Sequence, residues 1–264
     1  MRFYDYEKNN LVFIENKANP KFWDRLWQDQ LSKTSIIKKD LIIAPTTKMY
    51  LKKGSRILEG GCGHGSYVDI LNKQGYECIG IDYAKETIKL VKKRHPDLPI
   101  YYGNLTKLKF GKNSFDAYWS IGVIEHFFYG YDKILQEMHR VLKKDGLAFV
   151  SFPYMSPLRM LKASLGSYER LTFKKEPRNF YQFALDHKKV IDNFEKKGFK
   201  LIKQKPYDGF SGLIKETNYC SFILNPIARY SKKHLFVAGI RFMISKIVEK
   251  FSSHSVLLVF RKVK

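Results

Sequence analysis

Four of the six residues from Gly60 to Gly65 are glycine, and they follow a short apolar run that includes Glu59. Glycine has no Cβ, so a backbone of this composition can turn sharply and approach a bound molecule closely. The next apolar run ends in Asp82, 17 residues after Gly65. A carboxylate at that point can accept hydrogen bonds from both hydroxyls of a ribose. The pair of features favours an adenosine ligand, whereas the glycines alone also occur in a tight strand-to-helix turn.

Two common nucleotide motifs do not fit this loop. Counted from Gly61 and Gly63, the third glycine of a dinucleotide fingerprint would stand at position 66, which is Ser66. A nicotinamide or flavin cofactor is therefore disfavoured. The chain also lacks the GK[ST] triplet of a phosphate-binding loop here, which excludes that class of nucleotide site.

The residues around the glycine loop alternate between short β-rich runs and helical patterns. We expect strands at residues 56–60, 77–81, 100–102, 115–120, 147–152, 199–205 and 255–261, and helices near 66–74, 85–94, 131–142 and 186–197. Strands and helices in this order predict an α/β fold, with right-handed crossovers and a parallel sheet covered on both faces. The carboxyl ends of its strands would bring Glu59 and Asp82 to one ligand-binding edge.

Three further segments lie outside this α/β core. Residues 1–45 are expected to form an N-terminal helical lid, because apolar residues in 19–40 recur at helical spacing. The α/β domain itself would take residues 46–208 and 254–264. Residues 209–253 separate the last two strands by more than a hairpin needs and predict a cap insertion, with 154–180 as a second excursion.

One stretch of the cap insertion, residues 235–251, has the pattern of an amphipathic helix. Its apolar positions are Phe236, Ile240, Met243, Ile244, Ile247 and Phe251, and they lie opposite Arg241, Lys246, Glu249 and Lys250. Such a helix usually packs into a core. The alternative is a helix that rests on an anionic bilayer and gives access to a lipid or quinone.

The combined motifs resemble those of class I S-adenosylmethionine-dependent methyltransferases, in the broad group that acts mainly on small molecules and includes the ubiquinone and menaquinone methyltransferases. The resemblance covers residues 40–205, with 255–261 as a final strand. Its motifs are residues 56–65, Asp82, 103–105, 113–120, 124–127 and 138–146, in family order. It implies a Rossmann-like seven-stranded methyltransferase sheet with helices on both faces, and S-adenosylmethionine as the cofactor.

The resemblance also implies a role for individual positions. Glu59 and the backbone of residues 60–63 would hold the methionine end of the cofactor, while Asp82 would bind the ribose. Tyr83 would lie along the ribose or adenine. The implied cofactor-binding residues are Glu59, Gly60, Gly61, Cys62, Gly63, Asp82, Tyr83, Asn104, Leu105 and Ser120. The family usually has aspartate where Asn104 stands, so we expect weaker binding of the adenine amine; His64 replaces a frequent threonine or serine.

His126 is the candidate catalytic residue. It follows the fourth strand of the α/β pattern, and histidine can act as a general base near neutral pH. The alternative is a histidine that is hydrogen-bonded at the strand end and shapes the loop. Some quinone O-methyltransferases bind a divalent cation here through two acids and a histidine. Because Gly122 replaces the first acid and leaves Glu125 and His126, no metal site is expected.

The charge distribution bears on partners. The formal net charge is +23, of which residues 151–264 contribute +15. A positive field attracts anionic small molecules, phospholipid head groups or nucleic acid without choosing between them, and the Lys-rich composition can also be a coding habit. We expect a small apolar or anionic methyl acceptor. An RNA methyltransferase, a non-catalytic S-adenosylmethionine-binding protein and a membrane-associated lipid or quinone methyltransferase are the alternatives.

The sequence also bears on location. Three widely spaced cysteines and an N-terminus without an apolar signal region predict a cytoplasmic protein, with peripheral membrane contact as the variant. The oligomeric state is left open.

Overall fold

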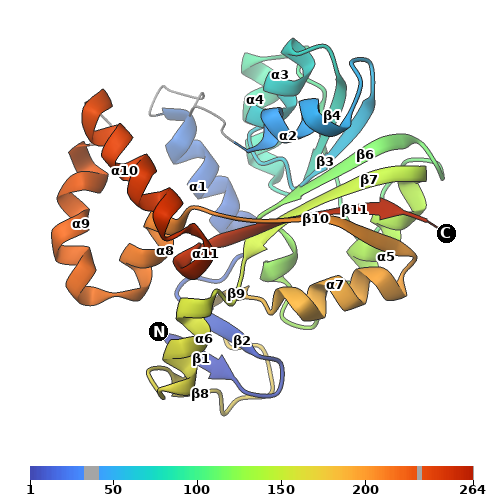
Figure 1. Ribbon diagram of the computed structural model, residues 1–264. Helices are drawn as coiled ribbons and strands as arrows, with labels where there is room; N and C mark the ends of the chain where they lie inside the picture. Colours follow the sequence, from blue (N-terminus) through green and yellow to red (C-terminus); the bar gives the residue numbers. More distant parts are fainter. Residues whose placement is uncertain (33–41, 231–233, 264) are drawn as a thin grey trace.

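The structure is a computed structural model that describes residues 1–32, 42–230 and 234–263, and its larger sheet has seven strands (Figure 1). The strand order is β10-β11-β7-β6-β3-β4-β5. These strands are β3 (Arg56–Gly60), β4 (Glu77–Asp82), β5 (Ile100–Tyr102), β6 (Phe115–Ile121), β7 (Leu142–Pro153), β10 (Phe199–Tyr207) and β11 (Ser255–Lys262). β3 to β7 pair in parallel, whereas β11 runs antiparallel to both β7 and β10. The predicted α/β class and the seven-stranded sheet are confirmed.

Helices cover both faces of this sheet. One face carries α2 (Ile43–Tyr50), α3 (Ser66–Lys73) and α4 (Lys85–Arg94), and the other carries α5 (Asp132–Val141) and α7 (His187–Lys196) (Figure 1). Side chains alternate along a strand, so Ala117 and Trp119 of β6 pack toward the first group and Tyr118 toward the second. The Trp119 ring stacks on Phe149 at 4.4 Å between ring centroids. Two apolar cores therefore fix the strand ends that carry the site.

The N-terminal segment differs from the expected helical lid. Its first residues form β1 (Arg2–Asp5) and β2 (Asn10–Ile14), which join β8 (Glu169–Arg170) and β9 (Phe180–Ala184) in a second sheet of order β8-β1-β2-β9. Among the described residues of this segment, α1 (Pro20–Ser32) and the start of α2 are helical, and residues 33–40 of the predicted helix lie outside the described part of the chain. The helical expectation is therefore corrected for residues 1–14. These strands are short, and β2 obtains its partner β9 from a distant part of the chain.

The expected excursion between β7 and β9 contains α6 (Pro157–Ser164), and a 3₁₀ turn, η1 (Ile124–His126), follows β6. The cap insertion is helical: α8 (Gly209–Glu216), α9 (Asn218–Tyr230), α10 (Leu235–Ile247) and α11 (Glu249–Ser252). The single helix predicted over 235–251 is divided at Val248. No residue of α10 is buried, so the interpretation of this helix as core is wrong. None of the described helices is both long and apolar enough to cross a membrane.

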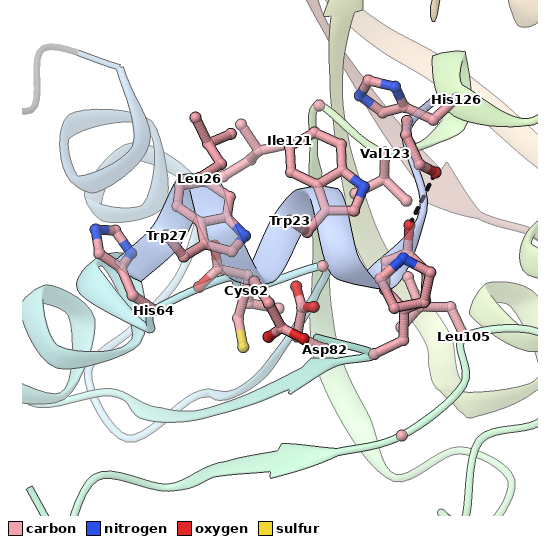
Figure 2. Close-up of a pocket in the computed structure, with 18 of the residues that line it drawn as sticks. Trp23, Leu26, Trp27, Cys62, His64, Asp82, Leu105, Ile121, Val123 and His126 are labelled. Atoms are coloured by element: carbon pink, nitrogen blue, oxygen red, sulfur yellow. Dashed lines mark hydrogen bonds between the residues drawn. The ribbon is translucent and has the colours of Figure 1, made fainter. Parts of the chain in front are cut away.

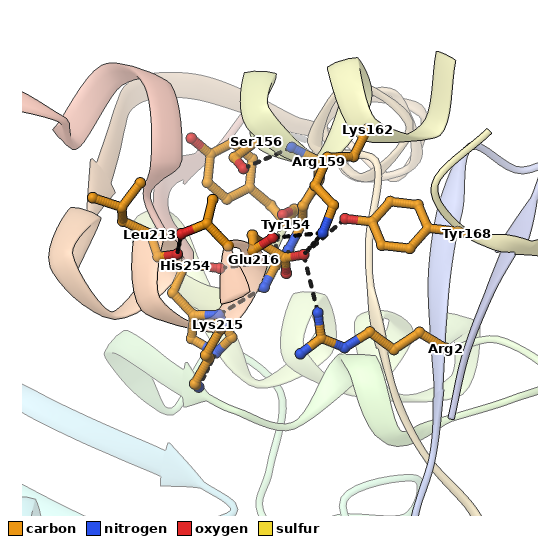
Figure 3. A network of polar contacts seen from close by, with 11 residues as sticks. Arg2, Tyr154, Ser156, Arg159, Lys162, Tyr168, Leu213, Lys215, Glu216 and His254 are labelled. Atoms are coloured by element: carbon orange, nitrogen blue, oxygen red, sulfur yellow. Dashed lines mark hydrogen bonds and ion pairs between the residues drawn. The ribbon is translucent and has the colours of Figure 1, made fainter. Parts of the chain in front are cut away.

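A buried ionic cluster ties the cap insertion to the second sheet (Figure 3). Glu216, at the end of α8, accepts a hydrogen bond on Oε1 from Arg159 Nε of α6 at 2.8 Å. Its Oε2 accepts from Arg2 Nη1 at 3.0 Å and from the Tyr168 hydroxyl at 2.8 Å. Lys162 Nζ donates to the Glu216 main-chain carbonyl at 2.6 Å. One carboxylate thereby joins β1, α6 and α8.

Candidate active site

The glycine loop lies between β3 and α3, and it turns in a way that few other residues permit. Gly61 and Gly63 have φ values of 81° and 54°, in the left-handed region that favours glycine. A Cβ on Gly61 would lie 2.5 Å from Val123 Cγ2, and one on Gly63 would lie 2.7 Å from the Trp27 ring. The loop is therefore held close to the residues that face it, and either substitution would push them apart.

Asp82 ends β4 beside this loop. The Gly63 amide donates to Asp82 Oδ2 and the Ala84 amide donates to Oδ1, each at 2.8 Å. Burial raises the pKa of Asp82, and these amide hydrogen bonds oppose the rise. Each carboxylate oxygen has a second lone-pair direction. The side chain is thus fixed in orientation and can still accept hydrogen bonds from a ligand.

A cavity of about 1190 Å³ opens over the carboxyl ends of β3, β4 and β6 (Figure 2). Eight of the predicted site residues line it: Glu59, Gly61, Cys62, Asp82, Tyr83, Asn104, Leu105 and His126. Gly60, Gly63 and Ser120 are not among the lining residues. Gly60 lies against the Tyr118 hydroxyl, Gly63 lies under Trp27, and Ser120 pairs with Gly60 inside the sheet. Burial raises the pKa of Cys62, so its thiol stays protonated.

Asn104 follows β5 in a local turn. Its Oδ1 accepts hydrogen bonds from the Thr106 amide and from the Thr106 hydroxyl, both at 2.9 Å. The carboxamide is therefore anchored by its own loop, and a ligand amine would share an oxygen that is already in use.

Helix α1 roofs the cavity. Trp23, Leu26 and Trp27 project from it into the cavity (Figure 2). The Trp27 ring stacks on His64 with centroids 5.0 Å apart. Asp24 Oδ1 on the same helix accepts from both the amide and the hydroxyl of Thr87, at 2.7 and 2.8 Å. The sequence pattern marked these aromatic residues only as one face of a helix.

His126 lies at the other end of the cavity, at the end of η1. Its Nδ1 lies 2.7 Å from the Tyr181 carbonyl oxygen of β9, which can only accept, so Nδ1 carries the proton and Nε2 keeps a lone pair. Burial lowers the pKa of His126 to about 4, although this hydrogen bond opposes the change. The Trp23 ring meets the imidazole edge to face at 4.9 Å. His126 is therefore a neutral, oriented acceptor at neutral pH.

Glu125 precedes it and is buried at the cavity wall. Burial raises the pKa of Glu125 to about 8, against opposing hydrogen bonds from backbone amides. Its Oε2 has no hydrogen-bond partner among the described residues. At neutral pH this side chain is mainly a protonated acid that can donate a hydrogen bond.

Several lining residues have no signal in the sequence motifs. Tyr181 and Gln182 reach the cavity from β9, which belongs to the second sheet. No described residue of the cap insertion lines the cavity, although the chain length had suggested a substrate cap. Within the described residues, no group of three or more His, Cys, Asp or Glu side chains is arranged to hold a metal ion.

Comparisons with known proteins agree with this architecture. Residues 58–150 match a family model described as a methyltransferase domain. A probable S-adenosylmethionine-dependent methyltransferase of Mycolicibacterium smegmatis is 35% identical over 100 residues, which are 38% of either chain. The demethylmenaquinone methyltransferase of Lysinibacillus sphaericus is 26% identical over 61% of this chain and 76% of its own.

The matched part therefore spans well under half the length of the first of these relatives. Among solved structures, an S-adenosylmethionine-dependent methyltransferase from Methanosarcina mazei has a TM-score of 0.55 and 18% identity, covering 84% of this chain and 99% of that one. That likeness supports the fold. Residues 58–150 are therefore similar to S-adenosylmethionine-dependent methyltransferase domains, and the seven-stranded sheet has the fold of the solved methyltransferase.

Proposed function

We propose that the protein transfers a methyl group from S-adenosylmethionine to a small apolar or anionic acceptor. The observation that carries the proposal is the single cavity that joins the glycine loop and Asp82 at one end to His126 at the other. Its volume of about 1190 Å³ is large enough for a nucleoside cofactor together with an acceptor. Trp23 and Trp27 of α1 cover this cavity, and methyl transfer benefits from the exclusion of water.

The cofactor end fits S-adenosylmethionine on the chemistry of its donors. Asp82 is the ribose acceptor, since both of its oxygens are held in place by amides yet retain lone pairs. The Glu59 carboxylate at the cavity wall suits the ammonium of the methionine end. Tyr83, Asn104 and Leu105 take the adenosine side, and Gly61 lies in the cavity wall beside them. When bound, the cofactor supplies an electrophilic methyl group on sulfonium.

The acceptor end is aromatic and has two proton-handling groups. Trp23, Tyr181 and Phe127 line it, and they favour an apolar ring or chain. Protonated Glu125 donates a hydrogen bond to an acceptor oxygen. His126 Nε2 would accept the proton that the attacking group loses on methylation. Most of the rate enhancement comes from holding donor and acceptor in line, a contribution of up to about 7–11 kcal/mol.

Calorimetry on the purified protein tests the cofactor assignment. We expect heat of binding with S-adenosylmethionine and with S-adenosylhomocysteine, because both share the adenosine and the amino-acid tail. Heat with neither compound would refute the proposal. Binding of both, without formation of S-adenosylhomocysteine in the presence of metabolite extracts, would instead support a non-catalytic binding protein.

Substitution of His126 tests whether this residue acts as the general base. His126→Gln keeps a hydrogen-bond acceptor but cannot take a proton at this pH, so kcat should fall by roughly 100-fold or more while KM changes little. Wild-type kcat/KM should be flat from about pH 6 to pH 7, because the pKa of His126 is lowered to about 4, and should fall at higher pH as Glu125, whose pKa is raised to about 8, loses its proton. Equal turnover in both proteins would assign His126 a positioning role only.

The proposal also concerns the kind of methyl acceptor and the location of the protein. The demethylmenaquinone methyltransferase relative is named for a quinone, and the aromatic acceptor end suits an apolar ring of that kind. An apolar acceptor of this kind partitions from water into a bilayer. A cytoplasmic protein that makes peripheral membrane contact would reach it there.

A further inference from the structure

The helix α10 turns its apolar side away from the rest of the protein. Leu235, Phe236 and Ile247 are 95%, 81% and 79% exposed. Phe242 and Met243 are also exposed on this helix, whereas Arg241 and Ser245 face the protein. A surface helix normally does the opposite and packs its apolar stripe into the core. Exposed apolar side chains gathered on one helix are typical of an interaction surface.

Helix α9 contacts α10 and also carries exposed apolar side chains. Phe222 is 85% exposed, and Ile223 and Tyr230 are exposed as well. We call the exposed apolar side chains of the two helices the α9–α10 face; they are Phe222, Ile223, Tyr230, Leu235, Phe236, Ile240, Phe242, Met243 and Ile247. Figure 1 shows α9 and α10 at one end of the molecule, projecting beyond the large sheet.

The face is held in this orientation by α8. Gly209 of α8 lies against the backbone of Ser245, where a Cβ would come within 2.6 Å of the carbonyl oxygen. The Ser245 hydroxyl accepts a hydrogen bond from the Phe210 amide, and the Arg241 guanidinium lies 5.3 Å from the centre of the buried Phe210 ring. Glu216 anchors α8 in turn through Arg159. The outward face is thus a consequence of packing on the inward side.

The charge of the cap insertion indicates which kind of partner the α9–α10 face binds. Residues 209–253 contain seven Lys and Arg residues and two acidic ones. Of these acids, Glu216 is buried in the ionic cluster and Glu249 pairs with Lys246 at 2.9 Å. Binding of a second copy of the chain would bring two basic surfaces together, one from each copy, which is electrostatically unfavourable. An acidic lipid surface offers both an apolar interior for the aromatic side chains and negative charge for the lysines.

We propose that the α9–α10 face docks on a bilayer that contains acidic phospholipid. This deepens the proposed function, and rests on it, by naming the surface through which an apolar acceptor would be reached. The aromatic and aliphatic side chains enter the head-group region, and Arg229, Lys246 and Lys250 lie at the level of the lipid phosphates.

Vesicle flotation tests this docking. We expect the wild-type chain to float with phosphatidylcholine vesicles that contain phosphatidylglycerol, and to float less with pure phosphatidylcholine or at high salt. The double substitution Phe236→Ser and Ile247→Ser should reduce the bound fraction at least tenfold. The matched control is Met49→Ser with Leu165→Ser, because these side chains are 75% and 72% exposed on other elements. That control should float like the wild type.

Three outcomes would overturn the inference. These are no flotation of the wild type, equal losses in both double variants, or a wild-type dimer in sedimentation that Phe236→Ser with Ile247→Ser dissociates. Cofactor binding is measured by calorimetry on the same preparations. A failure there refutes the proposed function, whereas a failure of flotation with cofactor binding intact refutes only the docking surface.

Discussion

Two buried glutamates of this protein have pKa values that are shifted in opposite directions. Glu216 lies in the ionic cluster beneath the cap insertion, and Glu125 lies in the cavity wall. Burial alone would raise the pKa of Glu216, but the guanidinium groups of Arg159 and Arg2 outweigh it and hold that pKa below its ordinary value. Glu125 has no such cation, and burial raises its pKa to about 8.

The difference separates a structural role from a functional one. The charge on Glu216 is compensated by Arg2 of β1 and Arg159 of α6, and the Tyr168 hydroxyl donates a further hydrogen bond, so the cluster is complete without a ligand (Figure 3). The carboxyl group of Glu125 retains an oxygen without a partner among the described residues, beside the neutral imidazole of His126. Incomplete satisfaction of buried polar groups is costly and is found where a ligand can supply what is missing.

The largest effect should come from breaking the compensated pair. Arg159→Met removes the fully buried partner of Glu216 and leaves a carboxylate with only the more exposed Arg2 and Lys162 nearby. We expect the free energy of unfolding to fall by about 3–5 kcal/mol, because an uncompensated buried charge is strongly destabilising. Urea denaturation measures this loss.

The double variant Arg159→Met with Glu216→Leu serves as its control. Removing both charges should restore much of the lost stability. If the single variant unfolds within about 1 kcal/mol of the wild type, then Arg159 is not the residue that compensates Glu216.

Asp82 provides the next test, at the cofactor end of the cavity. Asp82→Asn would place an amide NH₂ toward a backbone amide that now donates to the carboxylate, from either Gly63 or Ala84. We expect the affinity for S-adenosylhomocysteine to fall roughly 100-fold, equivalent to about 2.7 kcal/mol. Calorimetry measures it, and Asp69→Asn on the surface of α3 is the matched control. An affinity within threefold of the wild type would contradict the assigned ribose contact.

The sequence could predict a feature of these two sites only where its residues lie close together in the chain. The glycine loop and Asp82 lie within a few residues of the strands that they terminate, so their motif and spacing predicted the cavity edge. Glu216 meets Arg2 across most of the chain, and Tyr181 meets His126 from the second sheet. A spacing pattern contains no information on such contacts between distant segments.

Helix α10 illustrates a second limit. Its periodicity correctly predicted an apolar face, but the period is the same whether that face packs inward or remains uncovered. The strands β1 and β2 were missed for a related reason, because they are short and depend on the distant strand β9. In contrast, the long alternation of strands and helices in the central domain predicted the sheet.

The titration of Glu125 gives a pH-dependent effect on stability. Between its ordinary pKa of 4.5 and its raised value of about 8, the folded chain retains a proton that the unfolded chain releases. Stability should therefore fall as the pH rises through this window, by at most about 1.4 kcal/mol per pH unit. Glu125→Gln has no such proton. Its stability relative to the wild type should increase from pH 5 to pH 8 in urea denaturation, and parallel pH profiles would contradict a raised pKa.

The smallest effect is expected where an ion pair is exposed. Lys196 Nζ lies 2.6 Å from Asp192 Oδ2 on α7, closer than the 2.8 Å between Arg159 and Glu216, but both side chains are more than half exposed. Water and salt screen such a pair, so Lys196→Ala should change the free energy of unfolding by less than about 0.5 kcal/mol. Urea denaturation of this variant and of Arg159→Met separates the effect of burial on an ion pair from the effect of its N–O distance. A loss from Lys196→Ala comparable to that from Arg159→Met would mean that burial does not distinguish the two pairs.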